Sequence, residues 1–222
     1  MFFLTNQMTI YVIYLTNGGN MADALENYEY EDEPLNITGK IPFKGCTYKD
    51  YLSWGEDVRC ELIDGIPYMM AGVSLWHQDL LMAIFKQLYD FLEGKTCKVI
   101  IAPFDVRLFP EENKMDKTVV QPDIMVVCDP KKLEDGKACK GAPDFIIEIL
   151  SPSAKGRDLI DKKELYEKAG VKEYWIIDTD KLYKNILTNG IFVEEIIKLE
   201  CGDKINVDTL KDCVFTFPTI QK

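Results

Sequence analysis

The sequence predicts an α/β fold in which a central mixed β-sheet is flanked by helices. Two nearly continuous apolar runs, VVQPDIMVV (119–127) and PDFIIEIL (143–150), are typical of buried strands. Apolar residues at helical spacing over 74–92 predict a long amphipathic helix. The order strand, helix, strand over 143–178 implies a right-handed crossover between two parallel strands.

The chain has 222 residues, of which 47% are apolar and 28% charged. This length and composition indicate one globular domain with a substantial core, not two domains. The net charge is -11, but six acids and no base lie between Asp23 and Glu33, which leaves -5 for the remainder. That remainder neither supports nor excludes a nucleic-acid partner.

Residues 1–40 are expected to form a flexible acidic arm, and residues 41–222 the folded domain. The opening MFFLTNQMTIYVIYL has no basic n-region and is too short for a membrane span. Met21 starts the acidic segment, so residues 1–20 are either an upstream extension or a loose strand. No membrane association is expected.

Seven cysteines are scattered along the chain without any CxxC pair. Their odd number and spacing predict neither a disulfide framework nor a zinc site. We therefore expect a protein of the reducing cytoplasm.

The first half should contain a short helix over 47–57, capped by Thr47, with Tyr51, Leu52 and Trp54 on its buried side. A β-hairpin is predicted around Asp64-Gly65. The long helix over 74–92 should end at Gly94.

In the second half, we expect strands and one further helix. The strands are predicted at 97–110, 119–128, 143–152 and 173–178, with a polar loop over 111–117. The helix should run from about 158 to 169 and end at Gly170. Short antiparallel strands around an Asn189-Gly190 turn should complete the sheet.

Two acids stand out because they interrupt apolar strands. Asp123 precedes one strand and Glu148 lies inside another, where an unpaired acid costs several kcal/mol. Carboxylates that share a pocket repel unless a cation lies between them. Mg²⁺ accepts such oxygen ligands, and Mn²⁺ could replace it. The alternatives are a strand-edge acid for Asp123 and a buried ion pair for Glu148.

The segments QPDIMVV, FIIEILSPS and RDLIDKKELYEKAGVKEYWIID resemble the Uma family of restriction-endonuclease-like proteins, within the PD-(D/E)xK nuclease superfamily. The resemblance covers about 47–215 and implies a restriction-endonuclease-like core. It implies that Asp123 and Glu148 are the paired metal-binding acids. Leu150 stands where the superfamily pattern has lysine, and the resemblance implies that Lys162, rather than Lys163, takes this role from the following helix.

The upstream segments CELIDGIPYMM and SLWHQDLL also resemble this family. By this resemblance, Glu61 is a further metal-site acid and His77 a site residue. Glu61 alone reads equally well as an exposed cross-strand charge, and His77 as a helix cap or packing residue. Gln121 either faces the same pocket or is an ordinary turn residue, and Tyr166 is expected in the core.

The resemblance, together with these residues, implies a Mg²⁺-dependent endonuclease that hydrolyses phosphodiester bonds of DNA, with Asp123, Glu148, Lys162, Glu61 and His77 at its site. The superfamily habit of cutting both strands implies a homodimer. The alternative is a non-catalytic binding or scaffold module in which the buried acids pair with Lys162. The acidic balance and the lack of a basic cluster favour that alternative.

Overall fold

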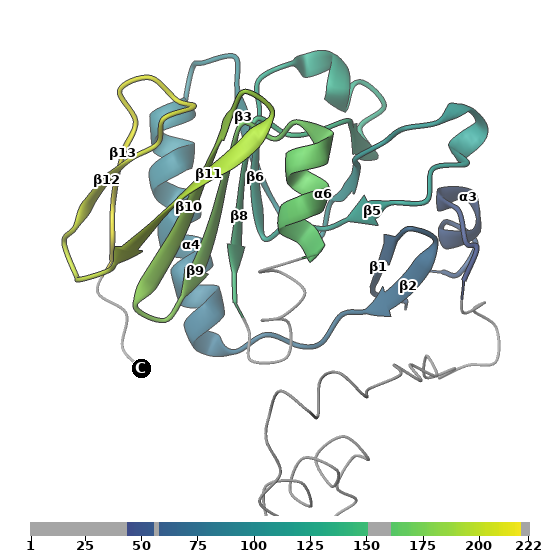
Figure 1. Cartoon of the computed structure of the whole chain (residues 1–222), viewed down its shortest axis with the longest axis horizontal. Coiled ribbons are helices and arrows are strands. Elements are labelled where there is room, and N and C mark those ends of the chain that lie inside the picture. The colour runs from purple at the N-terminus through teal and green to yellow at the C-terminus, as the bar shows by residue number, and fades with distance from the viewer. Residues whose placement is uncertain (1–43, 56–57, 151–160, 219–222) are drawn as a thin grey trace, which may run out of the picture. The chain divides into compact units, whose positions relative to one another are not determined.

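The computed structural model describes residues 44–55, 58–150 and 161–218. The arm predicted over 1–40 and the expected helix start at Asp158 lie outside these residues. The described part is a mixed α/β fold built on a six-stranded and a five-stranded sheet, with a small two-stranded sheet near the C-terminus (Figure 1). The predicted fold class is confirmed.

The six-stranded sheet has the order β11-β10-β9-β8-β6-β3. Only β8 and β9 are parallel, and all the other neighbours are antiparallel. Every residue of the central strand β8 is buried, as its apolar sequence predicts. The strands are β3 (Lys98–Ile101), β6 (Ile124–Val127), β8 (Phe145–Ile149), β9 (Glu173–Asp178), β10 (Lys181–Thr188) and β11 (Ile191–Lys198).

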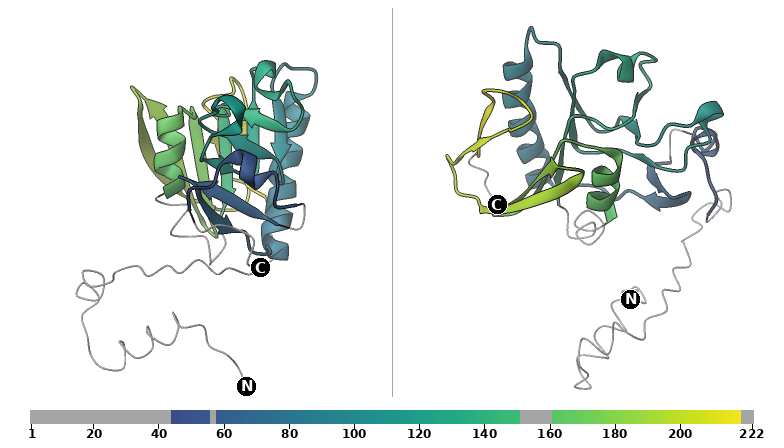
Figure 2. Two further views of the ribbon diagram at one scale, coloured as in Figure 1. Left: turned by 90° about the vertical axis from the view of Figure 1, so that its right-hand side faces the viewer. Right: turned by 45° about the horizontal axis from the view of Figure 1, so that its top comes forward.

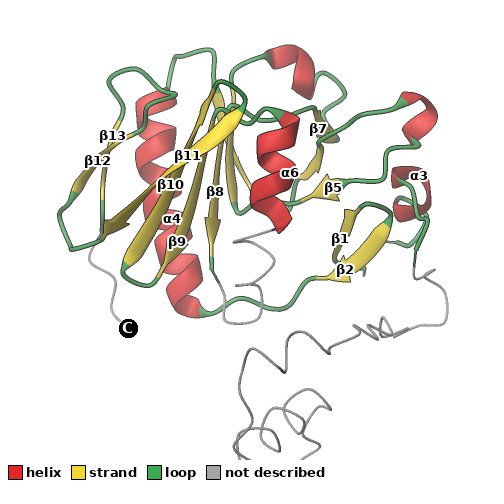
Figure 3. Cartoon of the chain, in the orientation of Figure 1, coloured by secondary structure: helices red, strands yellow, loops and turns green. Residues whose placement is uncertain are grey.

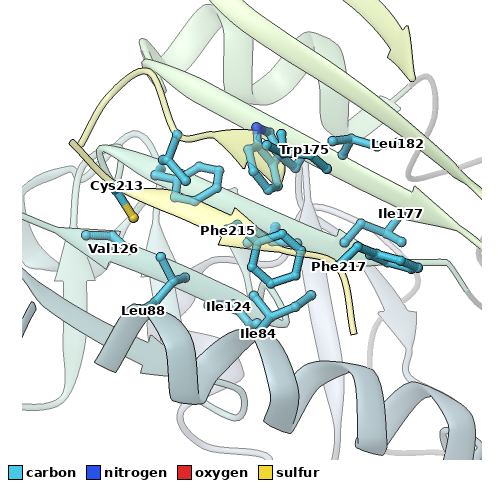
Figure 4. Packing of buried hydrophobic residues seen from close by; sticks show 14 of the residues in the cluster. Ile84, Leu88, Ile124, Val126, Trp175, Ile177, Leu182, Cys213, Phe215 and Phe217 are labelled. Atoms are coloured by element: carbon cyan, nitrogen blue, oxygen red, sulfur yellow. The ribbon is translucent and has the colours of Figure 1, made fainter. Parts of the chain in front are cut away.

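Two helices cover opposite faces of this sheet, α4 (Leu75–Leu92) and α6 (Asp161–Ala169) (Figure 2, left). Ser74 caps α4 by accepting a hydrogen bond from the backbone N–H of His77. The apolar side of α4 packs on the sheet, with the side chains of Ile84 and Leu88 against Ile124 and Val126 (Figure 4). The predicted 74–92 helix is therefore confirmed.

The five-stranded sheet has the order β2-β1-β5-β4-β7. Its hairpin turns at Asp64-Gly65, where both residues have positive φ, as a tight hairpin requires. Figure 3 shows the loops and short helices that connect the strands. The remaining strands are β1 (Cys60–Ile63), β2 (Ile66–Met69), β4 (Asp105–Arg107), β5 (Val119–Val120), β7 (Ala138–Lys140), β12 (Lys204–Asn206) and β13 (Val214–Thr216), and the 3-10 helices are η1 (Glu112–Lys114) and η2 (Pro130–Leu133).

Two predicted strands each prove to be two strands in different sheets. The segment 97–110 divides into β3 and β4 on either side of Pro103, and 119–128 divides into β5 and β6 on either side of Pro122. Proline has no N–H to donate to a strand ladder, so each apolar run is interrupted where the chain passes from one sheet to the other. Asp123 lies at the second interruption, directly after Pro122.

The first predicted helix is shorter than expected. Helix α3 spans only Tyr48–Tyr51, and Thr47 caps it as predicted by accepting from the N–H of Asp50. Leu52 was wrongly placed on the buried side, since it is 48% exposed. Tyr48 fills the buried position instead, because four residues make a single turn and only one side chain points fully inward.

The cysteine prediction was also wrong in one respect. Cys97 and Cys128 form a disulfide between the strands β3 and β6. The register that pairs Lys98 with Val127 places the two cysteines directly opposite each other, with their Cα atoms 3.9 Å apart. Thirty-one positions separate them in sequence, so no local spacing reveals the pair.

Candidate active site

Asp123 and Glu148 lie side by side where β6 and β8 run next to each other. The register that pairs Ile124 with Ile147 brings the two acids opposite each other. The N–H of Asp123 donates to Oε2 of Glu148 at 3.3 Å, and the N–H of Ile149 donates to Oδ2 of Asp123 at 2.7 Å. Each carboxylate is thus fixed by the backbone of the neighbouring strand.

Helix α6 brings Lys162 and Tyr166 to Glu148. These residues are four positions apart and share one helix face, which packs on the sheet. Nζ of Lys162 and the hydroxyl of Tyr166 each donate to Oε1 of Glu148 at 2.9 Å. Burial, followed by the charge of Glu148, raises the pKa of Tyr166 well above its ordinary value. The hydroxyl therefore stays protonated and serves as a donor.

Glu61 comes from the other sheet and joins the same cluster. It is buried in β1, and its Oε1 lies 2.9 Å from Nζ of Lys162. The backbone N–H of Gln121 donates to the same oxygen at 2.9 Å. Lys162 consequently bridges two buried carboxylates, Glu61 and Glu148, that belong to different sheets.

His77 contacts the cluster through Asp123. It lies on the buried side of the first turn of α4, and its Nε2 is 3.0 Å from Oδ2 of Asp123. Within the described residues its Nδ1 is buried without a hydrogen-bond partner. His77 therefore orients Asp123 through Nε2.

The cluster carries an excess of negative charge. Among the residues that the structure describes, Asp123, Glu148 and Glu61 contribute three formal negative charges and Lys162 one positive charge, which leaves -2 with His77 counted as neutral. Asp123 is 17% exposed, whereas Glu148 and Glu61 are almost fully buried. Oδ1 of Asp123 accepts no hydrogen bond from the residues that the structure describes. A divalent cation would neutralise this charge, and Asp123, as the most exposed of the three acids, could contact it.

The donor set fits Mg²⁺ on chemical grounds. Mg²⁺ is commonly held by one or two carboxylates, with waters and substrate phosphates as the remaining ligands. Over residues 44–55, 58–150 and 161–218, no group of three or more His, Cys, Asp or Glu side chains is arranged around a common metal position. Asp123 and Glu148, which lie side by side, could therefore hold the ion, whereas Glu61 contacts Glu148 only through Lys162.

A layer of polar residues behind the site was not predicted. Oδ1 of Asp105 accepts from the hydroxyl of Tyr51 and from Nε2 of Gln121, both at 2.9 Å. These contacts hold Gln121, whose backbone N–H orients Glu61. The sequence offers Gln121 as a pocket residue, but nothing in the sequence around Asp105 distinguishes that acid from an ordinary strand-edge acid.

Comparisons with known proteins give a family match and a structural match. The model of the Uma2 family, described as "Putative restriction endonuclease", matches residues 48–197. A crystal structure described as "a putative nuclease belonging to DUF820 from Anabaena variabilis ATCC 29413" superimposes with a TM-score of 0.58 at 17% identity, covering 73% of this chain and 89% of that chain. This likeness shows a shared fold. No curated protein has a significant sequence match.

Proposed function

The chain belongs to the Uma2 family of restriction-endonuclease-like proteins, and we propose that it is a metal-dependent endonuclease that hydrolyses phosphodiester bonds of DNA. The observation that carries this proposal is the pair of carboxylates, Asp123 and Glu148, held side by side at the edge of a cluster with a formal charge of -2. A pair of hard oxygen donors with this charge suits a divalent cation that also contacts a phosphate.

Asp123 and Glu148 would hold Mg²⁺, for which Mn²⁺ can substitute. When bound, the ion would activate the attacking water and neutralise charge that develops on the phosphate. Backbone groups already orient both carboxylates, so little reorganisation is needed when substrate arrives. His77 holds Asp123 in place from the side of α4.

Lys162 would stabilise the negative charge that develops on the phosphate. Its ammonium group is anchored by Glu61 and Glu148, so a positive charge stays beside the metal-binding carboxylates. Tyr166 supports this arrangement because its hydroxyl satisfies the same oxygen of Glu148 that Lys162 contacts. The products would be a strand end bearing the phosphate and another bearing a hydroxyl.

The test is nicking of supercoiled plasmid DNA in Mg²⁺ or Mn²⁺ by the wild type and by Asp123→Asn. The variant keeps the shape of the side chain but removes its charge, and we expect activity to fall by at least about 100-fold, the size of effect seen when one charge-stabilising group is removed. Asp180→Asn, at an exposed turn residue, is the matched control and should retain full activity. Equal nicking by the wild type and Asp123→Asn would refute the proposal.

A second candidate function follows from the pairing of Lys162 with two carboxylates. A buried ion-pair cluster of this kind also suits a non-catalytic nuclease-fold module that binds a partner. In that case divalent cations should not alter the melting temperature of the wild type. A rise in melting temperature with Mg²⁺ or Mn²⁺, absent in Glu148→Gln, favours the enzyme.

A further inference from the structure

The solvent-facing side of helix α4 carries a row of exposed apolar side chains. Leu75, Met82 and Tyr89 are 76%, 53% and 56% exposed. They are spaced seven residues apart, so they form one stripe along the helix. The ring of Phe85, which is half-buried, extends this stripe because its centroid lies 5.6 Å from that of Tyr89. The opposite side of α4 packs in the core and carries His77.

Charged residues border the stripe along one side. Asp79 and Lys86 lie three positions before and four positions after Met82, and helical geometry places both on the same flank. Lys86 forms an ion pair with Asp90 at 2.7 Å, but both side chains are largely exposed. The pair therefore contributes little to stability, and Lys86 can pair with another acid instead.

From this arrangement we propose that two copies of the chain associate through α4, antiparallel, with the two-fold axis at Met82. Such an axis places Met82 against Met82 and Leu75 against Tyr89 of the second copy. The same axis brings the charged flanks of the two helices together. Asp79 of each copy then lies near Lys86 of the other copy, which gives two equivalent ion pairs. The face is complementary to itself in both shape and charge, which is what an isologous two-fold interface requires.

A second exposed apolar surface, on the edge strand β11, fits a second copy less well. Antiparallel two-fold self-pairing about the middle of β11 sets either Glu194 or Glu195 against the same residue of the second copy, and like charges directly opposite each other are unfavourable. The α4 face therefore is the better interface. The α4 face lies on the side of the helix away from His77, and this proposal does not depend on nuclease activity.

The experiment is sedimentation equilibrium of the full chain with charge-exchange variants. We expect the wild type to be a dimer, and Asp79→Lys and Lys86→Glu each to raise the dimer dissociation constant at least about tenfold, because each sets like charges together. The double variant Asp79→Lys/Lys86→Glu restores opposite charges and should return to within about threefold of the wild type. Met82→Glu, at the two-fold axis, should be monomeric.

Glu195→Lys, on exposed β11, is the charge-change control and should remain dimeric. Circular dichroism melting of every variant verifies that α4 stays folded. A monomeric wild type at about 100 μM would overturn the proposal, since specific dimers commonly have micromolar or tighter dissociation constants. A dimer that is insensitive to Met82→Glu, or a double variant that fails to regain association, would overturn the α4 pairing.

Discussion

Nζ of Lys162 lies 2.9 Å from Oε1 of Glu148, so a buried ion pair joins helix α6 to the centre of the six-stranded sheet. Helix α6 follows β8 in the chain, but the pair forms only because the crossover to β9 returns the helix over the strand that carries Glu148. The same ammonium group reaches Glu61. Stability and the candidate chemistry therefore both depend on the ammonium group of Lys162.

We predict that Lys162→Met destabilises the protein by about 3–5 kcal/mol, because it leaves Glu61 and Glu148 buried without a counter-charge. Lys163→Met is a closely matched control, since the neighbouring lysine makes only a partly exposed pair with Glu194. It should cost about 1 kcal/mol or less. Urea unfolding of both variants measures the difference, and equal losses would contradict the buried pairing.

Tyr166→Phe should cost about 1.5–3 kcal/mol, the range for a hydrogen bond to a charged group. The substitution removes only the hydroxyl that donates to Glu148. Tyr183→Phe, at a half-buried tyrosine of β10, provides the control and should be nearly neutral. If the two variants unfold at the same urea concentration, the Tyr166 hydroxyl does not support Glu148.

Much of the fold follows from local sequence patterns, because periodicity and turn chemistry act over a few residues. The hairpin at Asp64-Gly65, helix α4 and strand β8 are all predicted in this way. The division of two apolar runs between sheets could not be predicted, since it depends on which distant strands are available to pair on either side of Pro103 and Pro122.

The candidate site, too, could be predicted from the sequence only in part. Asp123 and Glu148 stand out in the sequence because acids interrupt apolar strands. The contact between Lys162 and Glu61 could not be predicted from spacing, because it joins residues 101 positions apart, one on helix α6 and the other on strand β1. Asp105 was missed for the same reason, since its partners come from α3 and from the bend before β6.

The buried Glu173 should make stability depend on pH. Burial raises its pKa above the ordinary 4.5, despite hydrogen bonds from the N–H of Thr209 and from Trp175. Below about pH 4.5 both folded and unfolded chains hold this proton, so the contribution is fully present. As the pH rises toward the raised folded pKa, the unfolded chain releases its proton first and stability is lost.

Glu173→Gln removes this titration. The free energy of unfolding of the variant, relative to the wild type, should therefore increase as the pH rises from 4 to 7, whatever its absolute value. Urea unfolding at several pH values measures the trend, with the exposed Glu195→Gln as a control that shows none. A relative stability of Glu173→Gln that is constant with pH would contradict the raised pKa.

The disulfide between Cys97 and Cys128 predicts sensitivity to reductant. Opening a loop of 31 residues should lower stability by about 3–4 kcal/mol on the loop-entropy model. Thermal melting with and without dithiothreitol measures the shift, and peptide mass spectrometry without reductant should detect the linked pair. The double variant Cys97→Ala/Cys128→Ala should be unaffected by reductant. A wild type that melts at the same temperature in both conditions would show that the bond does not contribute.

Calorimetric titration of Mn²⁺ and Mg²⁺ into the wild type, Asp123→Ala and Glu148→Ala tests the central claim, that these two carboxylates form one cation site. It requires no choice of substrate. We predict saturable binding of one ion to the wild type and loss of binding in both variants, while Asp180→Ala binds as the wild type does. If the wild type binds neither ion, and still binds none when a non-cleavable DNA duplex supplies phosphate ligands, the claim is contradicted.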